Sequence, residues 1–125
     1  MAPDGLLYSK DHEWAKIEGD TATVGITDYA QNSLGDIVYV ELPRVGQTVA
    51  EHASIGVVES VKAVSEIFTP VGGEIVAINA ELEKDPAAVN RDPFGAGWMY
   101  KVKLGSPTPA GLMNAEAYEQ MVTAQ

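Results

Sequence analysis

The chain of 125 residues contains no cysteine. Disulfide bonds, a catalytic thiol and zinc sites built on thiolates are therefore excluded. Histidine is nearly as scarce, since His12 and His52 are the only two and lie far apart in the chain. A metal site needs several ligands at local spacing, so we expect no metal centre. Any redox or sulfur chemistry in this protein would have to come from a cofactor that brings its own sulfur.

Long apolar runs are also missing, because no segment approaches the ~20 residues that a membrane-spanning helix requires. Residues 1–5 lack the basic and apolar regions of a secretory signal and the arginine-rich character of a transit peptide. We therefore expect no membrane association and a cytoplasmic location in a bacterium. A mitochondrial protein would have the same features after processing, so that location stays open.

Basic residues are few compared with acidic ones. Eight lysines and arginines stand against 18 aspartates and glutamates, which gives a formal net charge of -10. Such a field repels phosphate backbones and disfavours nucleic-acid binding. The same charge favours protein partners that have basic docking surfaces.

The length is typical of one domain, which we expect to span residues 1–125. Its glycine pairs at 72–73 and 95–97 match neither dinucleotide-binding nor P-loop spacing, and no Gly-x-Ser-x-Gly motif occurs. Most carboxylates are expected to lie on a solvated surface. A small β-rich hydrolase using Asp11, His12 or Glu13 remains an alternative, as does a structural β-domain without chemistry.

Short strand-like runs separated by turn signals dominate the chain. They span 14–18, 21–26, 36–42, 54–59, 64–69, 74–79 and 98–104. Gly19-Asp20 is a two-residue hairpin signal between the first two runs. Many short strands at regular spacing favour a mainly-β sandwich or flattened barrel.

Helical signals are brief. Thr27 and Gly35 predict the two ends of a short helix over 28–34, and residues 85–90 form at most one helical turn. Near the C-terminus, Thr108-Pro109 and Asn114 are start signals for short helices within about 106–123. An apolar stripe there (Tyr118, Met121 and Val122) is expected to pack against the sheet.

One lysine lies near the tip of a short connection at 60–64, between two β-prone runs. Its neighbours Val61 and Ala63 are small and uncharged, so nothing adjacent in sequence would pair with the Lys62 ammonium. A weak internal similarity between residues 35–40 and 73–78 places this turn between two related strand units. Spacing alone does not distinguish a modified lysine from a solvated one, and the solvated lysine is the commoner case.

Several ordered blocks carry a resemblance over about 6–122. They are residues 8–14, 24–31, 34–43, 59–63, 70–74, 89–95, 97–99 and 112–118. In these blocks the sequence resembles the H-protein family of the glycine cleavage system. The resemblance implies a barrel-sandwich hybrid of the lipoyl-domain type with a C-terminal helical segment, and Lys62 matches the lysine to which lipoate is attached.

The resemblance also implies a function as a carrier and not as an enzyme. In the family, a pyridoxal-phosphate-dependent glycine decarboxylase loads the aminomethyl group of glycine onto the lipoyl arm. A tetrahydrofolate-dependent aminomethyltransferase then takes the methylene group, and dihydrolipoamide dehydrogenase reoxidises the dithiol. A lipoyl or octanoyl transferase, or a lipoate ligase, attaches the arm. A shuttle of this kind gains from diffusing freely, so we expect a monomer.

The family docks its loaded arm in a cleft on the carrier's own surface. By position, Glu13 matches the cleft glutamate, Asp11 stands where some relatives carry serine, and Glu66 stands where many carry aspartate. The alternatives within carriers are a lipoyl or biotinyl domain of another complex and a lipoyl relay to other enzymes. Biotin carriers favour methionines around the lysine, and lipoyl domains of 2-oxo-acid dehydrogenases usually place aspartate where this chain has Val61.

Overall fold

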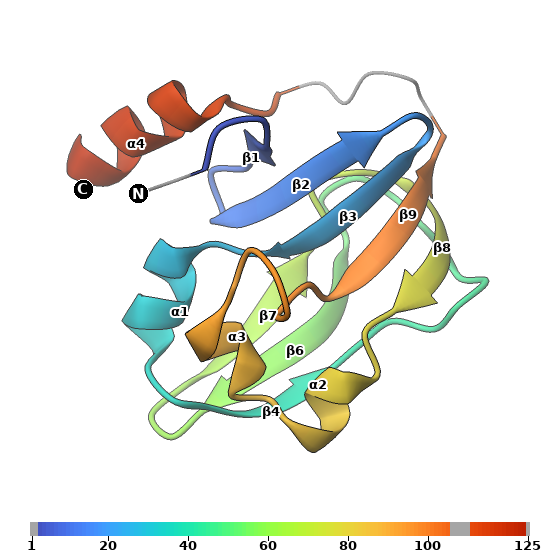
Figure 1. Ribbon diagram of the computed structural model, residues 1–125. Coiled ribbons are helices and arrows are strands. Elements are labelled where there is room, and N and C mark those ends of the chain that lie inside the picture. Colours follow the sequence, from blue (N-terminus) through green and yellow to red (C-terminus); the bar gives the residue numbers. More distant parts are fainter. Residues whose placement is uncertain (1–2, 106–110, 125) are drawn as a thin grey trace.

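The computed structural model describes residues 3–105 and 111–124, which form two antiparallel sheets and short helices (Figure 1). One sheet has the order β1 (Leu7–Tyr8), β2 (Glu13–Glu18), β3 (Thr21–Ile26), β9 (Tyr100–Leu104), β8 (Gly73–Ile78) and β5 (Thr48–Val49). The other has the order β4 (Ile37–Glu41), β6 (Ser54–Ser60) and β7 (Val64–Phe68). The helices are α1 (Asp28–Leu34), α2 (Glu81–Lys84), α3 (Ala88–Arg91) and α4 (Ala115–Ala124). The expected mainly-β fold is confirmed.

The core lies between the two sheets. Val24 and Val102 from the six-stranded sheet belong to one buried cluster with Val40, Val58 and Ile67 from the three-stranded sheet. Burying such side chains stabilises the fold by ~1.5–3 kcal/mol each. The sheets therefore pack as a sandwich, and in the described part of the chain no ladder of strand pairs closes them into a complete barrel.

The predicted hairpin is formed by β2 and β3, which pair from Glu13↔Ile26 to Glu18↔Thr21. Gly19 has a φ of 63°, a left-handed conformation that glycine adopts without a steric cost. On β3, Ala22, Val24 and Ile26 are buried, as the alternation of the sequence requires for one face of a strand.

Both predicted ends of α1 are present. The hydroxyl of Thr27 accepts a hydrogen bond from the N–H of Ala30 at 3.2 Å and so caps the first turn. At the other end, Gly35 has a φ of 85° and its N–H donates to the carbonyl of Gln31 at 2.9 Å. The helix over 28–34 is confirmed, and it runs from the β2–β3 hairpin towards the three-stranded sheet (Figure 1).

The C-terminal segment contains one described helix, α4, which lies over β1 at the top of Figure 1. The side chain of Asn114 accepts the N–H of Ala117 at 2.9 Å, so this start signal works as predicted, whereas Thr108-Pro109 lies outside the described residues. Tyr118 stacks on Tyr8 at 4.7 Å between ring centroids, in a second cluster separate from the main core. The apolar stripe thus packs on β1 and its neighbours at one edge of the larger sheet.

Three elements were not predicted from the sequence: β1, β5 and α2. Both strands have only two residues and α2 has four, which is too short for a periodic pattern to develop. None of the described helices is long and apolar enough to span a membrane.

Candidate functional site

A tight turn joins β6 to β7 and presents Lys62. The Ser60 hydroxyl accepts the backbone N–H groups of Lys62 at 3.3 Å and Ala63 at 3.0 Å, and the Ser60 N–H donates to the carbonyl of Ala63 at 2.8 Å. Serine in this position stabilises a turn because its side chain replaces a backbone partner. The N–H of Val61 donates to the carbonyl of Asp36 at 3.1 Å, which ties the turn to the start of β4.

The turn projects from the three-stranded sheet beside the segment that follows α1 (Figure 1). Lys62 is exposed and, within the described residues, forms no ion pair or side-chain hydrogen bond. A Cβ placed on Gly35 would lie 3.5 Å from Cε of Lys62, so the aliphatic stem runs past the end of α1. The neighbours Val61 and Val64 are also exposed, at 71% and 67%. The amino group is therefore accessible to another protein.

Asn90 stabilises the segment from the end of α1 to the start of β4, next to which the aliphatic stem of Lys62 lies. Its side-chain amide donates to the carbonyl of Gly35 at 2.9 Å and to Oε1 of Gln31 at 2.8 Å, and its Oδ1 accepts the N–H of Ile37 at 2.8 Å. The sequence offered little sign of this role. Neither the turn serine nor Asn90 was predicted as a site residue, although serine in a turn was a usable signal.

Glu13 is a buried carboxyl, 4% exposed, at the start of β2. Burial raises its pKa to about 8, against the lowering effect of hydrogen bonds from the Ser9 hydroxyl and the Phe68 backbone. The Ser9 hydroxyl donates to Oε1 of Glu13 at 2.6 Å. Near neutral pH the carboxyl is thus mostly protonated, and a nearby cation would favour its ionised form.

The other two predicted cleft residues are both exposed but lie in different places. Asp11 belongs to the same loop as Glu13, and its charge adds to the rise of the Glu13 pKa. Glu66 lies on β7, where it accepts a hydrogen bond from the Ser54 hydroxyl at 3.0 Å. No contact in the described residues joins Glu66 to Asp11 or Glu13. The loop and the strand are joined by a hydrogen bond between Glu13 and the backbone of Phe68. Phe68 lies two positions (~6.6 Å) along β7 from Glu66.

The two histidines lie in separate loops. His12 has a φ of 67°, its Nδ1 lies 2.8 Å from the Tyr118 hydroxyl, and its ring is 4.5 Å from that of Tyr29. Burial lowers the pKa of His12. His52 is exposed and pairs with Glu51 at 3.1 Å. Within residues 3–105 and 111–124 no group of three or more possible ligands could hold a metal ion. The contact of His12 with a serine is made by the backbone, since its N–H donates to the carbonyl of Ser9 at 3.1 Å.

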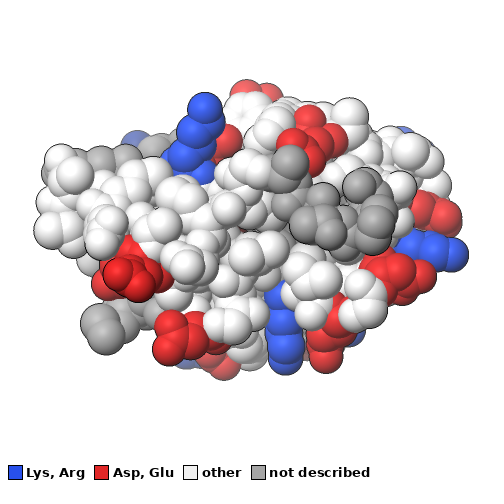
Figure 2. Space-filling view, turned by 90° about the horizontal axis from the view of Figure 1, so that it is seen from above, with Lys and Arg blue, Asp and Glu red and all other residues white. Residues whose placement is uncertain are grey.

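Charge is dispersed over the face that carries α4. Figure 2 shows acidic and basic side chains scattered across this face with broad uncharged areas between them. No continuous basic area is visible there, in agreement with the net charge of -10.

The chain is similar to known proteins over almost its full length. The family model described as glycine cleavage H-protein matches residues 6–125. A glycine cleavage system H protein of Opitutus terrae is 55% identical over 96% of this chain and 96% of its own length. One from Thermus thermophilus is 50% identical over 98% and 97% of the two chains. The crystal structure of a glycine cleavage system H protein from Mycobacterium marinum superimposes with a TM-score of 0.92 at 39% identity, covering 98% of this chain and 99% of that one.

Proposed function

The chain belongs to the glycine cleavage H-protein family, and we propose that it is a lipoyl carrier whose lipoate is attached through an amide bond to Lys62. The observation that carries this proposal is the exposed Lys62, held at the tip of a turn that Ser60 fastens and free of any ion pair in the described residues. A ligase or transferase can approach such an amino group without opening the fold. Acylation removes the positive charge of the lysine, and here that breaks no ion pair.

Bound lipoate would supply the disulfide that a cysteine-free chain cannot provide. With it, the protein would carry the aminomethyl group from the glycine decarboxylase to the aminomethyltransferase and then present the dithiol to dihydrolipoamide dehydrogenase. We propose that residues 1–125 act in this way as one monomeric carrier domain in the bacterial cytoplasm. A tethered group reaches each active site at a high effective concentration, which is the physical advantage of a carrier over free diffusion of the cargo.

We also propose that the loaded arm docks in a cleft lined by Glu13, Asp11 and Glu66, with the buried Glu13 carboxyl at its inner end. A buried carboxyl costs less free energy when it is neutral, and a pKa of about 8 lets Glu13 stay mostly protonated while no cation is near. A cationic aminomethyl group would favour the carboxylate and form a charge-assisted hydrogen bond with it. Asp11 and Glu66, which are both exposed, would add negative charge at the edges.

The proposal is tested by intact-mass analysis of the protein from its native cell, followed by mapping of the modified peptide. We expect the mass of one lipoyl group on Lys62, no modification of Lys62→Arg, and no glycine decarboxylation supported by that variant. Lys84→Arg, a change at an exposed lysine on α2, is the matched control and should be modified and active. A biotinyl mass, an unmodified lysine or an active Lys62→Arg would contradict the proposal. A lipoylated chain that is inactive with the glycine decarboxylase would indicate a relay to other enzymes.

A further inference from the structure

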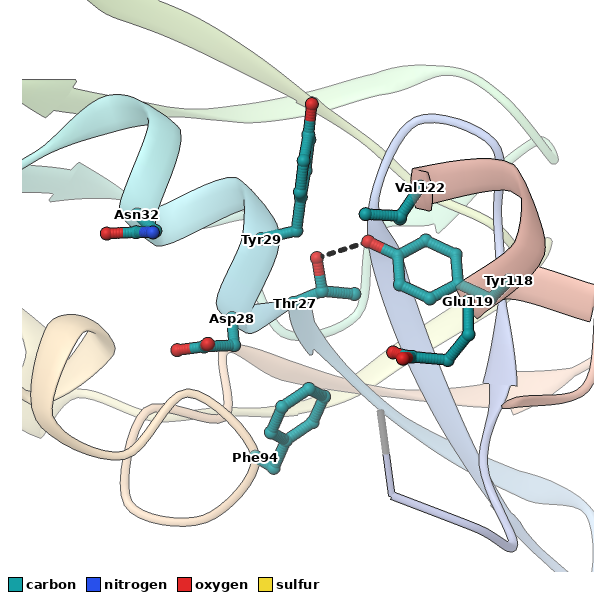
Figure 3. A pocket seen from close by; sticks show the side chains of 8 residues that line it. All are labelled: Thr27, Asp28, Tyr29, Asn32, Phe94, Tyr118, Glu119 and Val122. Atoms are coloured by element: carbon teal, nitrogen blue, oxygen red, sulfur yellow. Dashed lines mark hydrogen bonds between the residues drawn. The ribbon is translucent and has the colours of Figure 1, made fainter. Parts of the chain in front are cut away.

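A pocket of about 220 Å³ lies between the start of α1, the loop before β9 and α4 (Figure 3). Three of its lining residues are aromatic (Tyr29, Phe94 and Tyr118) and two are acidic (Asp28 and Glu119). None of the described residues that line it is a lysine or an arginine. The volume is below the ~300–1,000 Å³ of most small-molecule sites and suits a single long side chain.

The rings of Tyr118 and Phe94 are fixed by contacts with residues that do not all line the pocket. The Tyr118 hydroxyl lies 2.7 Å from the Thr27 hydroxyl, a hydrogen bond drawn in Figure 3, and the Tyr118 ring stacks on Tyr8. The ring of Phe94 lies 6.0 Å from that of Trp14, whose indole N–H donates to the carbonyl of Pro93 at 3.0 Å. Rings fixed in this way lose little entropy when they contact a ligand.

The charged residues among those described as lining the pocket are both acidic. Burial is the main reason that the pKa of Tyr118 is raised to about 12; the hydrogen bond with Thr27 lowers it, and the nearby Tyr29, Glu119 and Asp28 contribute to the rise. The charges of Asp28 and Glu119 are therefore close enough to affect the Tyr118 hydroxyl in the wall of the pocket. Gln31 donates to Oδ1 of Asp28 at 2.8 Å, which orients that carboxylate.

We propose that this pocket receives an arginine side chain of a partner enzyme, with the guanidinium against the aromatic rings and paired with Asp28 and Glu119. Arginine fits better than lysine because its planar guanidinium stacks on aromatic faces and binds carboxylates through two parallel hydrogen bonds. A partner with a basic docking face is also what the net charge of -10 favours. The identity of the partner rests on the proposed carrier function, whereas the chemistry of the pocket does not.

The position of the pocket relative to Lys62 explains why a partner would use it. Helix α1 begins at the pocket with Asp28 and ends at Gly35, beside the stem of Lys62. Seven helical residues span ~10 Å. Because one short, capped helix connects the two places, an enzyme bound at the pocket would have Lys62 at a fixed distance and orientation from its binding site.

The first experiment tests the pocket without lipoate or enzymes. Backbone amide NMR signals of the unmodified chain are followed during titration with N-acetyl-arginine methylamide and, as a neutral isostere, N-acetyl-citrulline methylamide. We expect shifts at residues 27–29, 94 and 118–122 with the arginine compound alone, weakened in Asp28→Asn. Equal shifts with both compounds, or shifts elsewhere on the surface, would overturn the assignment.

The second experiment uses the lipoylated protein with the glycine decarboxylase and the aminomethyltransferase. Asp28→Asn and Glu119→Gln should each raise the KM for the carrier about three- to tenfold with at least one enzyme and change kcat less. The control Glu83→Gln removes one exposed charge on α2 and should leave KM unchanged. An unchanged KM of the pocket variants with both enzymes would refute a docking role. A chain that is never lipoylated would refute the proposed function alone, and arginine-specific shifts would still support the pocket.

Discussion

Replacing Glu13 by glutamine should remove a pH-dependent cost of folding. The carboxyl is 4% exposed, and burial is the main reason that its pKa rises from 4.5 to about 8 in the folded chain. Glutamine has nearly the same shape, remains neutral at every pH and still offers an oxygen to the Ser9 hydroxyl. The variant therefore isolates the cost of ionising this one group.

The direction of the change in stability with pH follows from the pKa of Glu13 in the unfolded and in the folded chain. Below pH 4.5 the carboxyl is protonated in both states, and above it the unfolded chain loses the proton while the folded chain keeps it up to about pH 8. The free energy of unfolding of the wild type therefore falls as the pH rises through this window. Above the window the contribution of Glu13 no longer changes with pH. One pKa unit corresponds to ~1.4 kcal/mol, so the whole window is worth on the order of 5 kcal/mol.

The assay is urea unfolding at a series of pH values from 5 to 9. The free energy of unfolding of Glu13→Gln, taken relative to wild type, should rise by several kcal/mol across this range. Glu83→Gln, which removes an exposed carboxyl on α2, should follow the wild-type curve. Parallel curves for wild type and Glu13→Gln would refute the reasoning, because they would mean that Glu13 ionises equally easily in both states.

Three further changes test the site and its supports. Glu13→Ala should leave lipoylation intact and speed loss of the aminomethyl group from the loaded protein, measured as ammonia release; unchanged decay would contradict the docking role. Ser60→Ala removes the acceptor of two N–H groups in the turn, so it should cost ~1 kcal/mol in urea unfolding and slow lipoylation of Lys62 followed by mass spectrometry. Tyr118→Phe should cost ~1–2 kcal/mol through the lost contacts of its hydroxyl, while Tyr39→Phe at an exposed position should cost nothing measurable in the same assay.

The elements that were predicted correctly depend on neighbours in sequence. The β2–β3 hairpin needs Gly19 at its turn, and α1 needs the Thr27 hydroxyl and Gly35 at its two ends. Each of these interactions spans only a few residues, so the side-chain pattern reveals it. The same reasoning found a short connection around Lys62, with β-prone runs on both sides.

The elements that were missed depend on distant partners. The two residues of β1 are a strand only because β2 lies on one side and the Tyr8–Met113 bridge on the other. The two residues of β5 are a strand only because they pair with β8. No local pattern reports such pairings, since the hydrogen bonds come from elsewhere in the fold.

The candidate site divides in the same way. Similarity of sequence pointed to Glu13, Asp11 and Glu66 together, but the structure places Glu13 inside the protein and leaves the other two exposed on different elements. The fold also brings the Phe68 backbone at the end of β7, more than 50 positions away in the chain, into a hydrogen bond with Glu13 that lowers its pKa against the effect of burial. The raised pKa of Glu13 could not be predicted from the sequence, because no residue next to Glu13 in the chain would favour a neutral carboxyl.

By itself, the amino-acid sequence determined the absence of thiols, the acidic charge, the hairpins, the capped helix and a lysine between two strands. Only the tertiary structure decided which carboxyl is buried, how His12 and Thr27 meet Tyr118, and where three aromatic rings and two carboxylates form a pocket. Turns and caps are made by residues a few positions apart, so their cause is local. Burial and electrostatic potential are sums over groups that the chain brings together from its whole length.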